Sequence, residues 1–199
     1  METAERRDLT LDFELRKADD SSGPGILAGY AAVFNSWSEP LGWFREIIRA
    51  GAFKDSLESG ADVRALVNHD TGRIIGRNKA GTLRVSEDNR GLKIEIDLPD
   101  TQDGRDLATS VTRGDITGMS FGFEVKKDRW TRNKDDELEE RELLEIELFE
   151  VSAVPFPAYP DTTLAKRSFD SAHPAPKTTP LDVSLSIGDF LKITNPLKS

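Results

Sequence analysis

Short runs of alternating apolar and polar residues occupy most of the chain between residues 9 and 158. Alternation has a period of two, which is typical of a strand with one buried face. We expect strands at residues 10–15, 25–34, 44–48, 63–67, 74–75, 82–85, 92–98, 119–125 and 143–154. Turn-forming residues separate several of these runs, as at Asp70-Thr71-Gly72 and Asn89-Arg90-Gly91. This spacing predicts an antiparallel β-fold.

Two segments carry the signals of helices instead. Residues 51–57 are expected to form a brief helix that stops at Gly60. Residues 101–113 are expected to form a longer helix, with Asp103 near its positive end and Gly114 as a left-handed stop. The predicted fold class is therefore α+β, mainly β, with few helices.

The two ends of the chain differ from its patterned body. We expect an N-terminal tail over residues 1–8, a folded domain over 9–166, a flexible linker over 167–180 and an apolar C-terminal tail over 181–199. The linker is rich in Ser, Pro, Ala and Lys and has too little apolar surface to fold. Residues 126–142 are densely charged, which predicts a solvated hairpin tip or a mobile loop.

Composition and charge remove several classes of function. The 27 basic and 36 acidic residues give a formal charge of -9, which disfavours nucleic acid and anionic lipid as partners. The absence of cysteine excludes disulfides, thiolate metal sites and a cysteine nucleophile. No stretch approaches the ~18 apolar residues of a membrane span, so a soluble cytoplasmic protein is expected. No metal or other cofactor is expected either.

His69 is the histidine placed for chemistry. It closes the apolar run 63–67 and precedes Asp70, so it lies where a strand gives way to a turn. Functional side chains often occupy such positions on a rigid scaffold. The other histidine, His173, falls in the predicted linker. The alternative for His69 is an ordinary strand-end histidine with local hydrogen bonds.

Ser120 is the candidate nucleophile, within Gly118-Met119-Ser120-Phe121-Gly122-Phe123. Alternation places it on the strand face opposite the three bulky apolar residues, which leaves its face available for a site. A serine hydroxyl is a weak nucleophile and needs a base such as imidazole within hydrogen-bond reach. Taken alone, the motif is better explained as a solvent-side serine on a strand.

Several motifs occur in a consistent order between about residue 9 and residue 166. They are Gly29-Tyr30-Ala31-Ala32-Val33-Phe34, Asn68-His69-Asp70, Gly76-Arg77, Gly81-Thr82-Leu83, Asp88, Gly91-Leu92, the stretch 114–123 and the stretch 148–158. Together they resemble the HK97-type phage prohead protease family. The resemblance implies a β-barrel protease flanked by helices, distantly similar to herpesvirus assemblin.

The resemblance also implies roles for individual residues. Ser120 would attack the scissile carbonyl and His69 would act as general base. An acidic residue on the late strand would orient the imidazole: Glu150 is favoured, and Glu147 is the second choice. In an unbulged strand these two side chains lie on opposite faces, so only one of them points at His69. Backbone amides near Ser120, in Gly72-Arg73 or in Gly76-Arg77 are candidates for the oxyanion hole.

The implied function is a serine endopeptidase that cleaves the scaffolding region of the major capsid protein inside the immature shell, in the host cytoplasm. The expected partners are this capsid protein and, in a homo-oligomer, further copies of the chain. Self-cleavage is predicted between the body and the apolar tail. A second hypothesis is an inactive assembly factor that docks through residues 181–197. A third, a plain β-barrel binding module, would leave the motifs around Ser120 and Glu150 unexplained.

Overall fold

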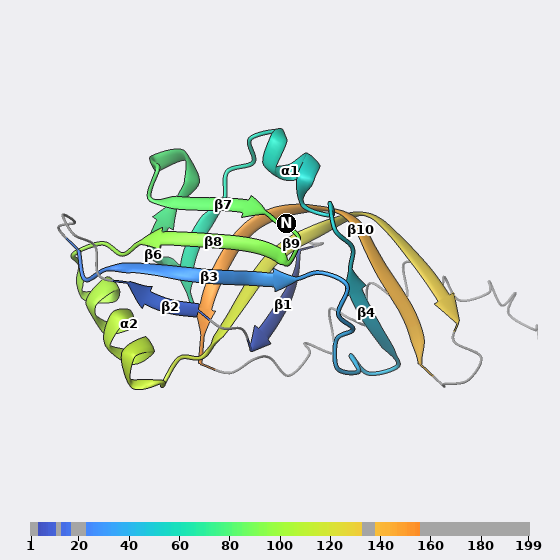
Figure 1. Cartoon of the computed structure of the whole chain (residues 1–199), viewed down its shortest axis with the longest axis horizontal. Coiled ribbons are helices and arrows are strands. Elements are labelled where there is room, and N and C mark those ends of the chain that lie inside the picture. The colour runs from blue at the N-terminus through green and yellow to red at the C-terminus, as the bar shows by residue number, and fades with distance from the viewer. Residues whose placement is uncertain (1–3, 11–12, 17–22, 133–137, 156–199) are drawn as a thin grey trace, which may run out of the picture.

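A computed structural model describes residues 4–10, 13–16, 23–132 and 138–155, and these residues form two β-sheets and two α-helices (Figure 1). The elements are β1 (Glu5–Thr10), β2 (Phe13–Arg16), β3 (Ile26–Val33), β4 (Phe44–Ile48), α1 (Lys54–Glu58), β5 (Arg64–Val67), β6 (Asp70–Arg77), the 3-10 turn η1 (Asn78–Ala80), β7 (Leu83–Glu87), β8 (Gly91–Asp97), α2 (Gln102–Arg113), β9 (Gly118–Arg132) and β10 (Glu139–Val154). Most predicted strands and both helices are thereby confirmed.

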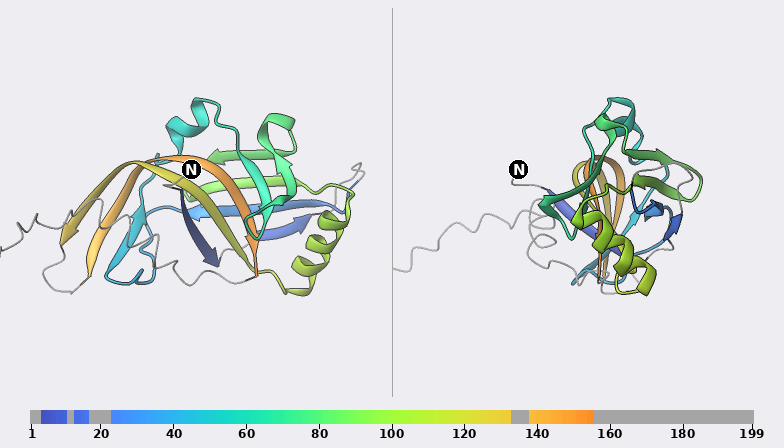
Figure 2. Two further views of the ribbon diagram at one scale, coloured as in Figure 1. Left: turned by 180° about the vertical axis from the view of Figure 1, so that it is seen from behind. Right: turned by 90° about the vertical axis from the view of Figure 1, so that its left-hand side faces the viewer.

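Strand β10 organises the larger sheet, whose order is β1-β9-β10-β5-β6. It pairs with β9 in antiparallel fashion over most of its length, and bulges interrupt this pairing near Glu145 and between Leu148 and Glu150. Its other edge pairs first with β4 and then with β5. The smaller sheet has the order β2-β3-β8-β7. Figure 2 shows α2 at one end of the molecule, and β4 with the outer parts of β9 and β10 at the other.

The mainly β fold with few helices is confirmed, but the expectation of one antiparallel barrel is not. Both β4 and β5 run parallel to β10, and the described strands divide between two sheets that share no ladder of backbone hydrogen bonds. Alternation along a sequence predicts that a segment is a strand. It carries no information about which neighbour the strand pairs with, or in which direction.

Buried apolar side chains from both sheets, from α2 and from the residues just before α1 form one core. Among its fully buried members are Leu27, Phe53, Ile94, Leu107, Phe121 and Phe123. The rings of Phe53 and Phe121 pack edge to face with centroids 5.6 Å apart. Helix α2 begins with a cap in which the Thr101 hydroxyl accepts a hydrogen bond from the Gly104 amide, and it ends at Gly114 with φ of 80°. Both ends match the sequence signals for this helix.

Of the two expectations for residues 126–142, the mobile loop is wrong for the part that the structure describes. The segment belongs to a hairpin, and its paired strands reach further into the charged stretch than a tip would. Strand β9 continues to Arg132 and β10 begins at Glu139, and the two pair directly. The expected tail over residues 1–8 is corrected too, because the edge strand β1 begins at Glu5. Charged residues form strands here because their side chains are paired with opposite charges. High charge in the sequence suggested solvent exposure instead.

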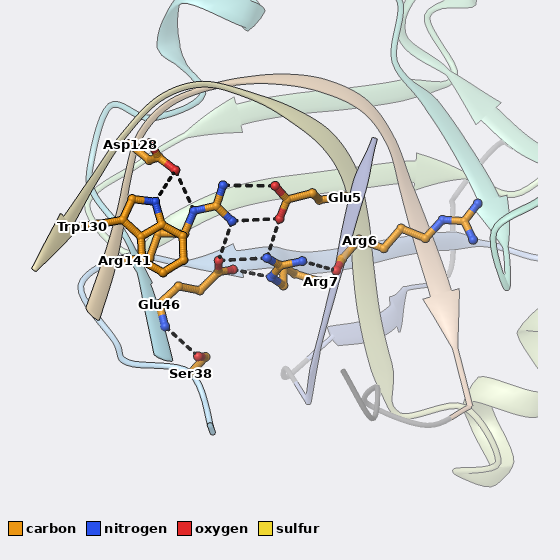
Figure 3. Close-up of polar contacts among 8 residues, drawn as sticks. All are labelled: Glu5, Arg6, Arg7, Ser38, Glu46, Asp128, Trp130 and Arg141. Atoms are coloured by element: carbon orange, nitrogen blue, oxygen red, sulfur yellow. Dashed lines mark hydrogen bonds and ion pairs between the residues drawn. The ribbon is translucent and has the colours of Figure 1, made fainter. Parts of the chain in front are cut away.

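A buried charge cluster joins β1 to the outer part of the larger sheet (Figure 3). It consists of Glu5, Arg7, Glu46, Asp128 and Arg141. Arg141 donates to both carboxylate oxygens of Glu5, at 2.9 and 3.1 Å, and through Nε to Asp128 at 2.8 Å. Arg7 donates to Glu46 and, at 2.6 Å, to Glu5. Only 3% of the Arg141 and Glu46 side chains is exposed.

The cluster keeps its guanidinium groups charged despite burial. Burial by itself lowers the pKa of Arg141, but hydrogen bonds from the guanidinium to Glu5 and the charges of Glu5 and Glu46 outweigh this effect and raise it. The same balance raises the pKa of Arg7, with Glu46 as the strongest partner. Trp130 and Phe123 lie against these cations, with ring centroids 5.2 Å from Arg141 and 5.4 Å from Arg7. The cluster is thus a paired, well-packed structural element.

Replacing Arg141 with methionine should destabilise the fold by ~3–5 kcal/mol, because it leaves the buried Glu5 carboxylate without its main partner. Urea unfolding measures this difference in free energy. The control is Arg113→Met, which removes an ion pair with Asp115 whose side chains are 70% and 53% exposed. Exposed pairs contribute at most ~1 kcal/mol. Equal stability of the two variants would contradict the structural role of the cluster.

Several expectations from the sequence lie outside the described residues. They are the linker over 167–180, the tail over 181–199, His173 and the predicted self-cleavage. None of the helices in the described ranges is long and apolar enough to cross a membrane.

Candidate active site

His69 lies in the tight turn that joins β5 to β6. Asn68 and His69 are its two central residues, with φ of 52° and 58°, and Val67 pairs with Asp70 across the turn. Positive φ at both positions is typical of a type I′ hairpin turn, in which the second position usually holds glycine. A histidine there costs backbone strain, and strain of ~1–3 kcal/mol per residue tends to occur at functional sites.

The imidazole of His69 faces Glu150 of β10. The distance from Nδ1 to Oε1 is 2.5 Å, and 12% and 13% of the two side chains is exposed. A ring that donates from Nδ1 to a carboxylate has its basic lone pair on Nε2. The contact therefore fixes one tautomer and one ring orientation, which is how an acidic residue assists a general base.

Gly122 makes room for this contact. It is the residue of β9 directly opposite Glu150, and a Cβ atom built on it would lie 2.6 Å from Oε1 and 3.0 Å from Cγ of Glu150. Contacts this short force a side chain to move. Any residue larger than glycine at this position would displace the carboxylate that His69 contacts.

Ser120 lies one strand away from the His69 contact, on the same face of the sheet. It pairs with Ser152 of β10, and Ser152 in turn touches both Glu150 and the His69 backbone. Directly opposite residues share a face, as do residues two apart on one strand. The arrangement places Ser120, Gly122, Glu150 and Ser152 on one face of β9 and β10.

The Ser120 hydroxyl is fully buried and makes no hydrogen bond within the described structure. The prediction that Met119, Phe121 and Phe123 lie in the core is confirmed. The opposite face was expected to be open at Ser120, but Ser120 is buried as well. Ser120 lies on an inner strand, between β1 and β10. Buried polar atoms nearly always have partners, and an unsatisfied one calls for an explanation such as a catalytic role.

Glu147, the second choice for orienting His69, lies elsewhere. Its carboxylate pairs with Lys126 at 2.6 Å, and 43% of its side chain is exposed. This carboxylate is part of a surface ion pair, and that pair raises the pKa of Lys126. Of the two acidic candidates, only Glu150 contacts the imidazole.

Two amides considered for the oxyanion hole are already engaged. The Gly72 N–H donates to the Asp70 carboxylate at 2.8 Å, and the Arg77 N–H donates to the Thr82 hydroxyl at 3.0 Å. A donor with an internal partner must break that bond before it can stabilise an oxyanion. These two amides are therefore poor candidates.

Ser152 is a site residue that sequence reasoning missed. Its hydroxyl donates to Oε2 of Glu150 at 2.6 Å and accepts from the His69 N–H at 3.2 Å. Its position two residues after Glu150 on a predicted strand was the available signal, since such residues share a face. The described residues contain no group of three His, Cys, Asp or Glu side chains placed to hold a metal ion.

The strain at His69 can be measured by comparing His69→Gly with His69→Ala. Both variants lose the imidazole and its contact with Glu150, so they differ in how well they tolerate positive φ. The left-handed conformation costs non-glycine residues ~1–2 kcal/mol. We expect the glycine variant to be more stable by ~1 kcal/mol in equilibrium unfolding, after allowance for the greater freedom of glycine in the unfolded chain. An alanine variant of equal or higher stability would show that the turn is unstrained.

Comparisons with known proteins identify the family of the chain. Residues 11–175 match the family model of the caudovirus prohead serine protease. The prohead protease of Enterobacteria phage HK97 is 34% identical over 126 residues, which cover 62% of this chain and 52% of that protein. The match thus spans about half the length of the HK97 protein. A solved structure, the capsid assembly protease of bacteriophage T4, aligns with a TM-score of 0.44 and 12% identity over 75% of this chain and 98% of that one. Because the family model matches most of the sequence, the chain belongs to the caudovirus prohead serine protease family.

Proposed function

We propose that this chain is a serine endopeptidase of phage capsid maturation, with Ser120 as nucleophile, His69 as general base and Glu150 as the residue that orients His69. The proposed substrate is the scaffolding region of the major capsid protein. The observation that carries the proposal is the 2.5 Å contact between His69, in a strained turn against β10, and Glu150 of β10, the strand that pairs with the strand of Ser120. Family membership supports the same reaction class.

The proposed reaction is acyl transfer to Ser120 followed by hydrolysis. The Ser120 hydroxyl attacks the scissile carbonyl while Nε2 of His69 takes its proton, and the proton then passes to the leaving amine. Water attacks the acyl-enzyme with His69 again as base. Glu150 stabilises the imidazolium that forms in both steps. Within the described residues, the Ser120 hydroxyl has no hydrogen bond to break before it turns toward the base.

The buried position of Ser120 adds a requirement to this proposal. The residue is 0% exposed, so a peptide carbonyl reaches it only after neighbouring atoms move. Catalytic hydrogen bonds often tighten only when substrate is bound. We therefore place the Ser120–His69 hydrogen bond in the substrate complex.

Co-expression with the major capsid protein of the same phage tests the proposed function. The wild-type chain should shorten the capsid protein at a defined position, which intact-mass measurement detects. A folded, soluble chain that leaves the capsid protein at full mass would contradict the proposal and favour an inactive assembly factor. Self-cleavage within residues 167–180 stays a prediction, and the intact mass of the chain in the same samples tests it.

A further inference from the structure

Ser152 has no role in the proposed reaction, yet it touches two parts of the candidate site. It is fully buried on β10 and lies directly opposite Ser120. Its hydroxyl uses both of its hydrogen-bonding functions. The O–H donates to Glu150, and the oxygen accepts the backbone N–H of His69. One side chain thereby links the carboxylate to the turn that carries the imidazole.

The bond to Glu150 fixes the rotation of the carboxylate. Oε2 binds Ser152 at 2.6 Å while Oε1 faces His69 Nδ1 at 2.5 Å, so the two oxygens have different partners. A carboxylate with one partner can rotate about its terminal torsion, which is broad. With two partners in different directions it has one orientation. Gly122 completes this restraint, because it leaves just enough space for the side chain.

The bond from His69 fixes the strained turn. The Asn68 N–H donates to the Ala153 carbonyl at 3.0 Å, and the His69 N–H donates to Ser152 at 3.2 Å. Both amides of the left-handed pair are thus bound to β10. A strained conformation persists only where its surroundings determine it strongly. Ser152 accepts one of these bonds to β10.

We propose that Ser152 is a positioning residue of the protease, which holds the Glu150 carboxylate and the His69 backbone in register with each other. The inference rests on the proposed function, because its effect is to aim the His69 ring at Ser120. Second-layer hydrogen bonds of this kind keep catalytic groups in productive geometry. Within the described structure, Ser152 makes no hydrogen bond to the Ser120 hydroxyl.

Ser152→Ala should lower kcat for a cleavage-site peptide by ~100-fold with KM unchanged, the usual cost of misplacing a catalytic group by ~1 Å. Ser152→Thr retains the hydroxyl and should recover part of this loss. The matched control is Ser56→Ala. Ser56 of α1 is also buried, and its hydroxyl accepts a hydrogen bond from the Leu148 amide at 2.9 Å. Leu148 lies on β10, the strand of Ser152. Ser56→Ala should retain wild-type kcat.

A second measurement reads the contact without using activity. In the inactive Ser120→Ala background, the His69 Nδ1 proton should give a strongly downfield resonance in the NMR spectrum. We expect Ser152→Ala to shift or abolish this resonance, and Ser56→Ala to leave it in place. Unchanged kcat and resonance in Ser152→Ala would overturn the inference. So would loss of the fold in Ser152→Ala alone, since it would indicate a purely structural role.

The two proposals fail in different ways. If peptide cleavage did not depend on Ser120, the proposed function would be wrong, whatever Ser152 does. If cleavage depended on Ser120 and Ser152→Ala had wild-type kcat, only the positioning role would be wrong. The resonance of His69 separates these cases in the absence of any turnover.

Discussion

Ser120→Ala should lower kcat/KM for a peptide spanning the capsid cleavage site by ~10⁶-fold, the loss seen when a serine protease loses its nucleophile. The same change should leave the free energy of unfolding equal to that of the wild type or raise it by ~1 kcal/mol. Ser120 is a buried hydroxyl without a hydrogen-bond partner in the described structure, and its removal ends an unfavourable desolvation. Peptide hydrolysis and urea unfolding measure the two effects.

Ser56→Ala is the matched control for Ser120→Ala, and it should behave in the opposite way. It also removes a buried hydroxyl, but one that accepts a hydrogen bond from the Leu148 amide. We expect full activity and a loss of ~1–3 kcal/mol in stability, because a buried amide loses its partner. If Ser120→Ala kept its activity and lost stability like Ser56→Ala, Ser120 would be a structural serine.

Glu150→Gln should lower kcat by ~10⁴-fold, as expected when a neutral amide replaces the carboxylate that orients the catalytic histidine. Glutamine keeps the shape of the side chain, but its amide can donate to Nδ1 and so hold the ring in the wrong tautomer. It also cannot stabilise the imidazolium. Steady-state hydrolysis of the same peptide measures the change.

Glu147→Gln is the control for this second substitution. The two residues lie on the same strand, but the Glu147 carboxylate pairs with Lys126 at the surface. Exposed pairs contribute little, so we expect wild-type kcat and stability within ~1 kcal/mol. A large loss of activity in Glu147→Gln with little loss in Glu150→Gln would reverse the assignment of the acidic residue.

Local sequence signals predicted the elements of the fold well. The negative charge of Asp103 near the helix start and the left-handed stop at Gly114 predicted the bounds of α2 to within a residue, and period-two alternation located most strands. The parallel pairing of β10 with β4 and β5 was not predictable in this way. Pairing depends on contacts between segments far apart in the chain, and a single sequence does not record them.

Charge misled the prediction at two places for one physical reason. The polar residues 1–8 suggested a tail, and the charged residues around Arg141 suggested a solvated hairpin tip or a mobile loop, because isolated charges avoid burial. In the fold these side chains neutralise one another within the charge cluster. The sequence shows each charge separately. Their pairing emerges only once β1, β4, β9 and β10 lie together.

The candidate site was predictable in part. Motif resemblance selected His69, Ser120 and Glu150. The structure brings His69 and Glu150 into contact with each other, and Ser120 lies on the neighbouring strand. The left-handed turn at Asn68 and His69 and the bridge made by Ser152 were not foreseen. Both depend on how the β5–β6 turn sits against β10, which is a matter of tertiary structure.

The central claim is that Ser120 is the nucleophile activated by His69, and labelling by a serine-directed phosphonate tests it most directly. The reagent is added while the chain is cleaving the capsid protein, and mass spectrometry maps the modified residue. We predict that cleavage stops as Ser120 alone becomes labelled, and that His69→Gly prevents the labelling. Cleavage that continues, or stops with the label on another residue, would contradict the account.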